Sequence, residues 1–201
     1  FNMLNFLEQD SKHHKEFKYL WERLQEWGES RNITTQATSK DQYLKLITEY
    51  DEYICAKGDS ELEDDALCDM IVVCIMIAII EGIDLQDFSR CYISPAQGMI
   101  TKDASIEAIS YHIRKLAESL LKKNRRNTIV NLHAIISAID ILYETSVYRG
   151  DILLVDVLDL VVTELEGRYG TFFNGAFVKS TDPDYDGIVT SVTAVQTLSK
   201  D

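Results

Sequence analysis

The sequence predicts an all-α protein built around a four-helix core, and three observations favour this fold class. Only two prolines and nine glycines interrupt the 201 residues, so long elements with few turns are expected. Apolar residues recur at spacings of three and four along most of the chain. Two apolar segments each follow a helix and a short polar turn, which is typical of an antiparallel helical hairpin.

The first expected element is a helix over residues 3–29, where Phe17, Leu20 and Leu24 lie at helical spacing. A polar connector follows this helix. Together they form an N-terminal unit of residues 1–38, which we expect to pack against the helical core.

The second helix is expected to follow Ser39, because a serine hydroxyl can accept a hydrogen bond from the backbone at a helix start. Leu44, Ile47, Tyr50 or Asp51, and Ile54 mark a helical stripe along this helix. A turn at residues 57–60 then reverses the chain.

The third helix, residues 61–81, becomes apolar on every side. Its apolar run, Met70–Ile80, is shorter than the roughly 20 residues that cross a bilayer, so we expect a buried core helix. With the loop that follows, it completes a unit of residues 39–100, which contains the first helix pair and a dense cluster of acids.

The second half of the chain repeats this plan with a shift of about 68 residues, ending at Gly150 where the first half ends at Gly82. Helices are expected over residues 104–123, 128–148 and 151–168, followed by a short hairpin within residues 169–182. We assign residues 101–180 to a second, degenerate helix pair with its C-terminal segment, and residues 181–201 to an irregular tail. The predicted fold is thus a bundle of two pseudo-repeated hairpins.

The net charge of −13 limits the classes of partner. Duplex nucleic acid and anionic membranes attract basic faces, so we expect neither as a partner. The four cysteines match no zinc-binding spacing and are expected to be buried thiols in a reducing compartment. No signal peptide is apparent, which favours a cytoplasmic location.

Four acidic residues are predicted to meet across the first hairpin. Glu49 and Glu52 share one helix face, and Asp65 and Asp69 share a face of the next helix. Facing residues of an antiparallel hairpin have a nearly constant sum of residue numbers. The sums for Glu52 with Asp65 and for Glu49 with Asp69 differ by one, so both pairs should face one another at similar levels.

Four converging carboxylates repel one another and need protons, cationic partners or divalent cations. Lys45 could neutralise only one of them, and no arginine lies in either helix. Oxygen ligands suit Mg²⁺ or Mn²⁺ rather than zinc. The alternative is a solvated acidic surface. Asp69 favours a site, because it stands at the threshold of a helix that is apolar on every side.

The remaining acids of this stretch are expected to face solvent or to edge the turn. They are Asp51, Asp59, Glu61, Glu63 and Asp64.

The same residues resemble the MazG-like branch of the all-α nucleoside triphosphate pyrophosphohydrolases, and most of all its bacteriophage forms. The resemblance covers residues 21–86 well, residues 160–180 fairly well, and the middle of the chain by layout alone. It rests on Trp27, on "RNI" at 31–33, on Gln42, Lys45, Glu49 and Glu52, on "DALCD" at 65–69 and on "RYGTFFNGAFVK" at 168–179.

This resemblance implies hydrolysis of a nucleoside triphosphate, with a deoxynucleotide expected, to the monophosphate and pyrophosphate. Mg²⁺ is the implied cofactor, with Mn²⁺ as a substitute, and a phage protein would act in the host cytoplasm. The candidate metal ligands are Glu49, Glu52, Asp65 and Asp69.

The resemblance also implies roles for individual side chains. The candidate catalytic residues are Glu49, Glu52 and Lys45, with either glutamate as the general base. The candidates to contact phosphate oxygens are Lys45, Arg168 and Lys179. Gln42, Asn32 and Trp27 are candidates for the base or sugar, and Trp27 is also a candidate core residue.

Three positions depart from the family pattern. Thr48 stands where the first glutamate of the "EExxE" motif is usual, Ala66 replaces a frequent glutamate, and Cys68 replaces a glycine. These departures support an alternative, a weak or inactive relative that binds a nucleotide or a protein partner. A purely structural acidic protein is the third hypothesis.

Family members usually build their four-helix unit from two chains, so the second hairpin would replace the partner here. The shift of about 68 residues sets Ala117, Leu120, His133 and Ser137 at the four acidic positions. We therefore predict a pseudo-dimer with one working site, and His133 as a packed core residue. A further homo-oligomer is compatible with this plan.

Overall fold

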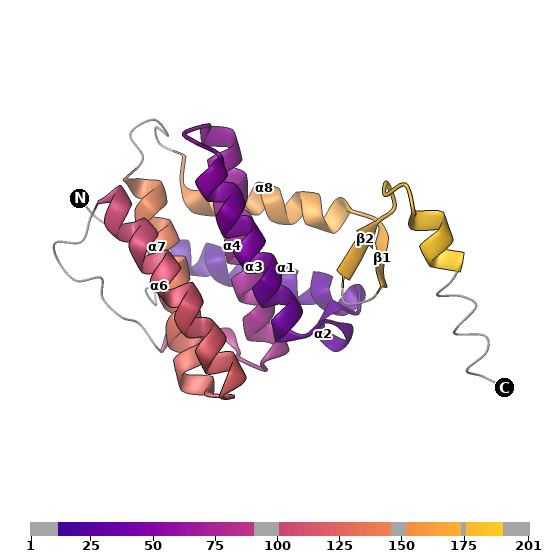
Figure 1. Ribbon diagram of the computed structural model, residues 1–201, viewed down its shortest axis with the longest axis horizontal. Helices are drawn as coiled ribbons and strands as arrows, with labels where there is room; N and C mark the ends of the chain where they lie inside the picture. Colours follow the sequence, from indigo (N-terminus) through magenta and orange to yellow (C-terminus); the bar gives the residue numbers. More distant parts are fainter. Residues whose placement is uncertain (1–11, 91–100, 146–151, 174–175, 191–201) are drawn as a thin grey trace.

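The computed structural model describes residues 12–90, 101–145, 152–173 and 176–190 (Figure 1). Its regular structure is mainly helical, which confirms the predicted all-α class. The elements are α1 (Lys12–Ser30), α2 (Ile33–Gln36), α3 (Ser39–Cys55), α4 (Ser60–Ile80), α5 (Leu85–Ser89), α6 (Lys102–Leu121), α7 (Arg125–Glu144), α8 (Leu154–Gly167), β1 (Gly170–Phe173) and β2 (Ala176–Lys179).

Two helical hairpins form the core, as predicted. Helix α3 packs on α4 and α6 packs on α7, and contacts of α4 with α7 and of α3 with α6 close a four-helix bundle. Each hairpin turns through a lysine in the left-handed conformation, Lys57 at a φ of 54° and Lys123 at a φ of 50°. The two turns therefore share this backbone conformation as well as their place between two helices.

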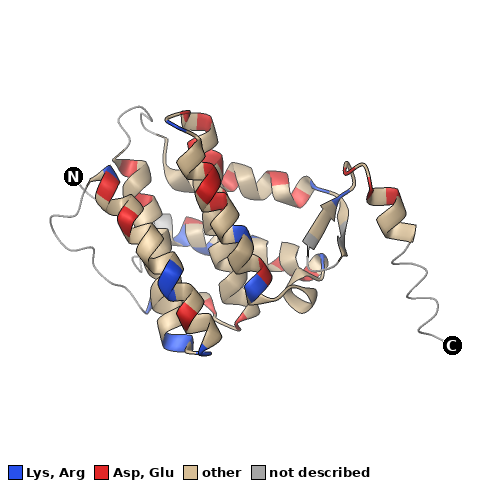
Figure 2. Ribbon diagram, viewed as in Figure 1, with Lys and Arg blue, Asp and Glu red and all other residues tan. Residues whose placement is uncertain are grey.

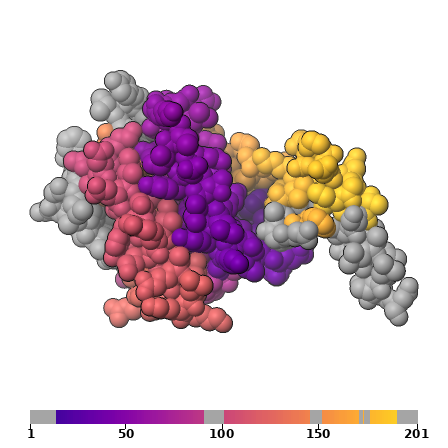
Figure 3. All heavy atoms as spheres, viewed as in Figure 1, coloured from indigo at the N-terminus to yellow at the C-terminus, as the bar shows by residue number. Residues whose placement is uncertain are grey.

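Helix α4 is the central element of the molecule. It contacts α3 and α7 within the bundle, and α1, α2 and α8 outside it. In the space-filling view, α3 and α4 run between α6 on one side and the C-terminal segment on the other (Figure 3). Every residue from Met70 to Ala78 is buried, which confirms the predicted core helix and explains why its sequence is apolar on all sides.

A layer of α1 and α8 covers the other side of α4. The guanidinium of Arg23 in α1 donates hydrogen bonds to Glu166, at 2.7 and 2.8 Å, and to Thr163 at 2.9 Å in α8. It also pairs with Asp159 of the same helix. These contacts fix the direction of α8 and so the position of the segment that follows it.

The predicted C-terminal hairpin is present. Strands β1 and β2 pair antiparallel, with Gly170 opposite Lys179 and Thr171 opposite Val178. A Cβ at Gly170 would lie 2.2 Å from the carbonyl oxygen of Val178 and 2.6 Å from the ring of Phe177. Glycine is therefore required for this close approach of the two strands.

Several predicted boundaries need correction. Thr38, not Ser39, caps α3, because its hydroxyl accepts from the backbone N–H of Asp41 while the Asp41 carboxylate accepts from the backbone N–H of Thr38. The two expected connectors contain the short helices α2 and α5, and residues 185–190 of the expected irregular tail are helical. The predicted helical residues 3–11 and 146–148 lie outside the described part of the chain.

The stripe predicted along α3 lies mostly outside the core, and only its Tyr50 packs partly against the core. Leu44, Ile47 and Ile54 are exposed, at 54, 41 and 45%, whereas Leu46 and Tyr53 are buried. The helix is rotated so that the face containing Glu49 turns inward. Apolar periodicity alone could not predict this rotation, because α3 carries apolar residues on two faces.

None of the described helices is both long enough and apolar enough to cross a membrane.

Candidate active site

The four predicted carboxylates lie on the facing helices α3 and α4 but differ in burial. Glu49 is buried, with only 6% of its surface exposed, and Asp69 is half-buried. Glu52 and Asp65 are exposed one turn nearer the hairpin tip. The arrangement is thus an inner pair at the core and an outer pair in solvent.

Glu49 is electrostatically strained by its surroundings. Its pKa is raised from 4.5 to about 7, mainly by burial and also by the charges of Asp69, Glu52 and Asp65, whereas Lys45 lowers it. Among the carboxylates, Asp69 has the largest effect on Glu49, as the matched-level argument expected. The four charges therefore act on one another across the hairpin.

Asp69 is shifted for the same reasons. Burial raises its pKa, Lys45 and Arg168 lower it, and Asp65 and Glu52 raise it. The Nζ of Lys45 lies 3.9 Å from Oε1 of Glu49. The charge of Lys45 thus acts on both Glu49 and Asp69. Arg168, which directly follows α8, adds a second positive charge near Asp69 that the sequences of α3 and α4 did not predict.

A cavity of about 450 Å³ opens beside Glu49 and Asp69, between α3, α4 and the C-terminal segment. Its wall contains three cations, three acids and a large apolar part. Its lining is Trp27, Ile33, Asp41, Gln42, Leu44, Lys45, Thr48, Glu49, Asp69, Val72, Val73, Met76, Leu165, Arg168, Phe177 and Lys179.

Most residues singled out from the sequence line this cavity. Gln42, Lys45, Arg168 and Lys179 do so, although they come from α3 and from the distant C-terminal segment. Asn32 does not line it: this residue is exposed in the left-handed conformation before α2, with a φ of 58°. Glu52 and Asp65 also lie outside the lining and reach the inner pair only through their charge.

The apolar wall includes residues that sequence reasoning missed. The ring of Phe177 lies 6.2 Å from that of Trp27, edge to face, and the guanidinium of Arg31 lies 5.8 Å from the Phe177 ring. Trp27 is half-buried and lines the cavity, so it is both a packing and a cavity residue. No helical period connects Phe177 with Trp27, so only the tertiary fold reveals this wall.

The acids fit a divalent cation in chemistry but are not gathered at ligand spacing. They offer only oxygen atoms, and the repulsion felt by Glu49 and Asp69 is what a bound cation would relieve. Across the described residues, however, no three His, Cys, Asp or Glu side chains are arranged to hold a metal ion. A cation at this site would have to draw the outer pair inward.

The second hairpin has no acids at the four positions set by the shift of about 68 residues. His133 and Ser137 stand there, with Oγ of Ser137 3.3 Å from Nδ1 of His133. His133 is fully buried beside Phe88, at 5.4 Å between ring centres, and burial lowers its pKa to about 4. It is a packed core residue, as predicted.

The acids around the hairpin tip mostly behave as expected. Asp51 and Glu61 are exposed, and Asp59 caps α4 by accepting from the backbone N–H groups of Glu61 and Leu62. Asp64 is half-buried, and Glu63 is buried and lies 3.3 Å from Nζ of Lys102 in α6. A long-range cation, invisible to local sequence reasoning, draws it inward.

Buried cysteines were expected, and Cys68 and Cys74 are buried. Cys55 is exposed, because it lies at the C-terminal end of α3 beside the hairpin turn. Cys91 lies outside the described residues.

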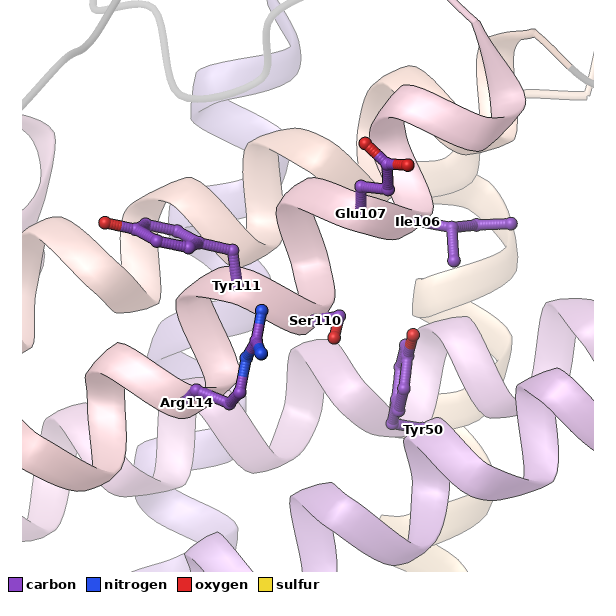
Figure 4. Close-up of a pocket in the computed structure, with 6 residues that line it drawn as sticks. All are labelled: Tyr50, Ile106, Glu107, Ser110, Tyr111 and Arg114. Carbon is purple, nitrogen blue, oxygen red and sulfur yellow. The ribbon is translucent and has the colours of Figure 1, made fainter.

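A second cavity, of about 410 Å³, lies between α3 and α6 (Figure 4). Tyr50 approaches it from α3, and Ser110 and Arg114 from α6. Its lining contains one carboxylate, that of Glu107. Figure 2 shows acids on most helices, so charge by itself does not locate a site. The joint presence of buried acids, cations and a cavity favours the first cavity.

No protein-family model, no curated protein and no solved structure matches the chain. The residues of the first cavity, beside Glu49 and Asp69, are therefore the basis for assigning a function.

Proposed function

We propose that the protein is a Mg²⁺-dependent nucleoside triphosphate pyrophosphohydrolase that releases pyrophosphate and a nucleoside monophosphate, with a deoxynucleotide as the expected substrate. The observation that carries the proposal is the composition of one cavity. It joins the buried Glu49 and the half-buried Asp69 to three cations and to an apolar wall with two aromatic rings. A nucleotide offers matching parts, since its phosphates are anionic and its base is flat and largely apolar.

Glu49, Glu52, Asp65 and Asp69 would hold the Mg²⁺. Bound Mg²⁺ would neutralise the charge of the phosphates and lower the pKa of a coordinated water. This metal assignment follows from the oxygen-only donor set and from the unrelieved repulsion between the inner acids.

The chain's own groups account for the remaining steps. Lys45, Arg168 and Lys179 would donate hydrogen bonds to phosphate oxygens. Glu49 would accept the proton of the attacking water, because its carboxylate lines the cavity, whereas that of Glu52, the other candidate base, lies outside the lining. The rings of Trp27 and Phe177 would cover the base and exclude water, while Gln42 offers an amide to the base or sugar.

The experiment is a panel of the four deoxynucleoside triphosphates with Mg²⁺, with pyrophosphate and monophosphate measured as products. Glu49→Gln and Asp69→Asn should each reduce turnover by roughly two to four orders of magnitude while helical circular dichroism is unchanged. Glu107→Gln, in the second cavity, is the matched control and should retain activity. A folded wild-type protein without turnover at high enzyme concentration would disprove the proposal.

A second candidate function is nucleotide binding without hydrolysis. The outer pair Glu52 and Asp65 stands apart from the cavity lining, and Thr48 lines the cavity where the resembled family has a glutamate. Calorimetry distinguishes the two functions. Binding of a deoxynucleotide with Mg²⁺ and no product after prolonged incubation would favour the non-catalytic relative.

A further inference from the structure

The cations of the cavity differ in their present partners. Lys45 lies near Glu49 inside the cavity, whereas Arg168 is held by an acid outside the cavity lining. Nε and Nη2 of Arg168 both donate to Oε1 of Glu164, at 3.2 and 2.6 Å. A phosphate oxygen that accepted from these N–H groups would therefore compete with Glu164.

Arg168 lies between two acids on different elements. Glu164 lies in the last turn of α8 and Arg168 directly follows the helix, so the two paired side chains are four residues apart. On the other side, the charge of Arg168 acts on Asp69 of α4. The Arg168 side chain is 27% exposed and that of Glu164 is 66% exposed. Arg168 therefore lies at the mouth of the cavity, and its partner Glu164 faces solvent.

Lys179 adds a second cation to this mouth. It lines the cavity from β2, and its charge also acts on Glu164. The two cations come from either side of the hairpin, which Gly170 keeps tightly paired. Both line the same cavity as Glu49 and Asp69, so together they offer a cationic subsite for an anion.

We propose that Arg168 and Lys179 form a subsite for a phosphate or pyrophosphate group, and that Glu164 is a positioning residue that occupies Arg168 until such an anion displaces it. The ligand class rests on the proposed function. Glu164 holds the guanidinium at the mouth in the empty protein and thereby competes with the ligand. Anion binding exchanges one carboxylate–arginine pair for a phosphate–arginine pair.

The test is a double-mutant cycle on binding of inorganic pyrophosphate, measured by calorimetry in Mg²⁺-containing buffer. Glu164→Gln should bind pyrophosphate about three- to ten-fold more tightly than the wild type, because the competing charge is lost. Arg168→Gln should bind it about ten-fold more weakly, and Glu164→Gln should then give a much smaller gain, because only its effect on Lys179 remains. Arg168→Lys should restore only part of the affinity, since lysine lacks the planar fork.

Glu107→Gln is the control for net charge and should leave the affinity unchanged. An equal gain from Glu164→Gln with and without Arg168 would overturn the inference, as would no pyrophosphate binding by any variant. Because the readout is binding, it separates the two proposals. Coupling between Glu164 and Arg168 without turnover of deoxynucleotides would disprove the hydrolase function alone, whereas turnover without coupling would disprove the subsite alone.

Discussion

At the scale of single residues, Glu49 is the most informative side chain. A carboxylate that is only 6% exposed, with Lys45 at 3.9 Å as its cationic neighbour, costs stability when it ionises. Proteins keep such groups where the charge is used, and perturbed acids in a cavity are therefore candidates for function. The sequence predicted that Glu49 and Asp69 lie at the same level of the hairpin, but it did not predict how deeply each is buried.

The raised pKa of Glu49 predicts a pH-dependent stability in metal-free buffer. Between pH 4.5 and about 7, the folded protein keeps a proton that the unfolded chain has lost, so the free energy of unfolding falls as the pH rises. Glu49→Gln removes this penalty. It should raise the free energy of unfolding by roughly 1–3 kcal/mol at pH 8 and change it little at pH 4.5.

Urea unfolding at the two pH values in EDTA measures this difference. Glu52→Gln is the control, because it makes the same charge change at an exposed position and should have a much smaller effect. An identical response of the two variants would contradict the burial-based explanation.

At the scale of elements, α3 has two apolar faces and buries only one. Its capping box at Thr38 and Asp41 sets where it begins. Contact with α4 then decides its rotation, and Glu49 occupies a place that a helix in an ordinary core would give to an apolar residue. The exposed stripe and the buried Glu49 are thus two results of the same rotation.

This rotation predicts that substitutions at two adjacent positions of α3 change the free energy of unfolding by very different amounts. Leu46→Ala empties a fully buried position and should lower the free energy of unfolding by about 2–4 kcal/mol. Ile47→Ser changes an exposed position and should alter it by roughly 0.5 kcal/mol or less. Chemical denaturation of both variants measures the contrast. If Ile47→Ser were the more damaging, the exposed stripe would be covered in solution.

At the scale of the whole molecule, α4 lies between two layers, with the bundle on one side and α1 and α8 on the other. The acids belong to the bundle, whereas Arg168, Phe177 and Lys179 belong to the segment after α8. The cavity therefore exists only while α8 is held in place, and α1 holds it through Arg23.

Arg23→Ala should weaken both the fold and the site. Loss of the bonds to Glu166, Thr163 and Asp159 should lower the free energy of unfolding by about 1–3 kcal/mol. It should also raise the KM for a deoxynucleotide more than it lowers kcat, because Arg168 and Lys179 lose their support. Thermal melting and steady-state kinetics measure the two effects.

Lys18→Ala is the matched control. Lys18 pairs within α1 with Glu22 at 3.8 Å on an exposed surface, so its removal should change stability by roughly 0.5 kcal/mol or less. A loss of stability in Arg23→Ala without any change in KM would show that α8 keeps its place without Arg23.

The sequence by itself determined the helical class, the two hairpins, the central apolar helix and the level at which Glu49 meets Asp69. These features depend on periodicity, turns and spacing, which act over a few residues. The tertiary structure alone decided the rotation of α3, the pairing of Glu63 with Lys102, and the meeting of Trp27, Phe177 and Arg168 at one cavity. Those contacts join segments far apart in the chain, and packing of α8 and the hairpin against the bundle brings them together.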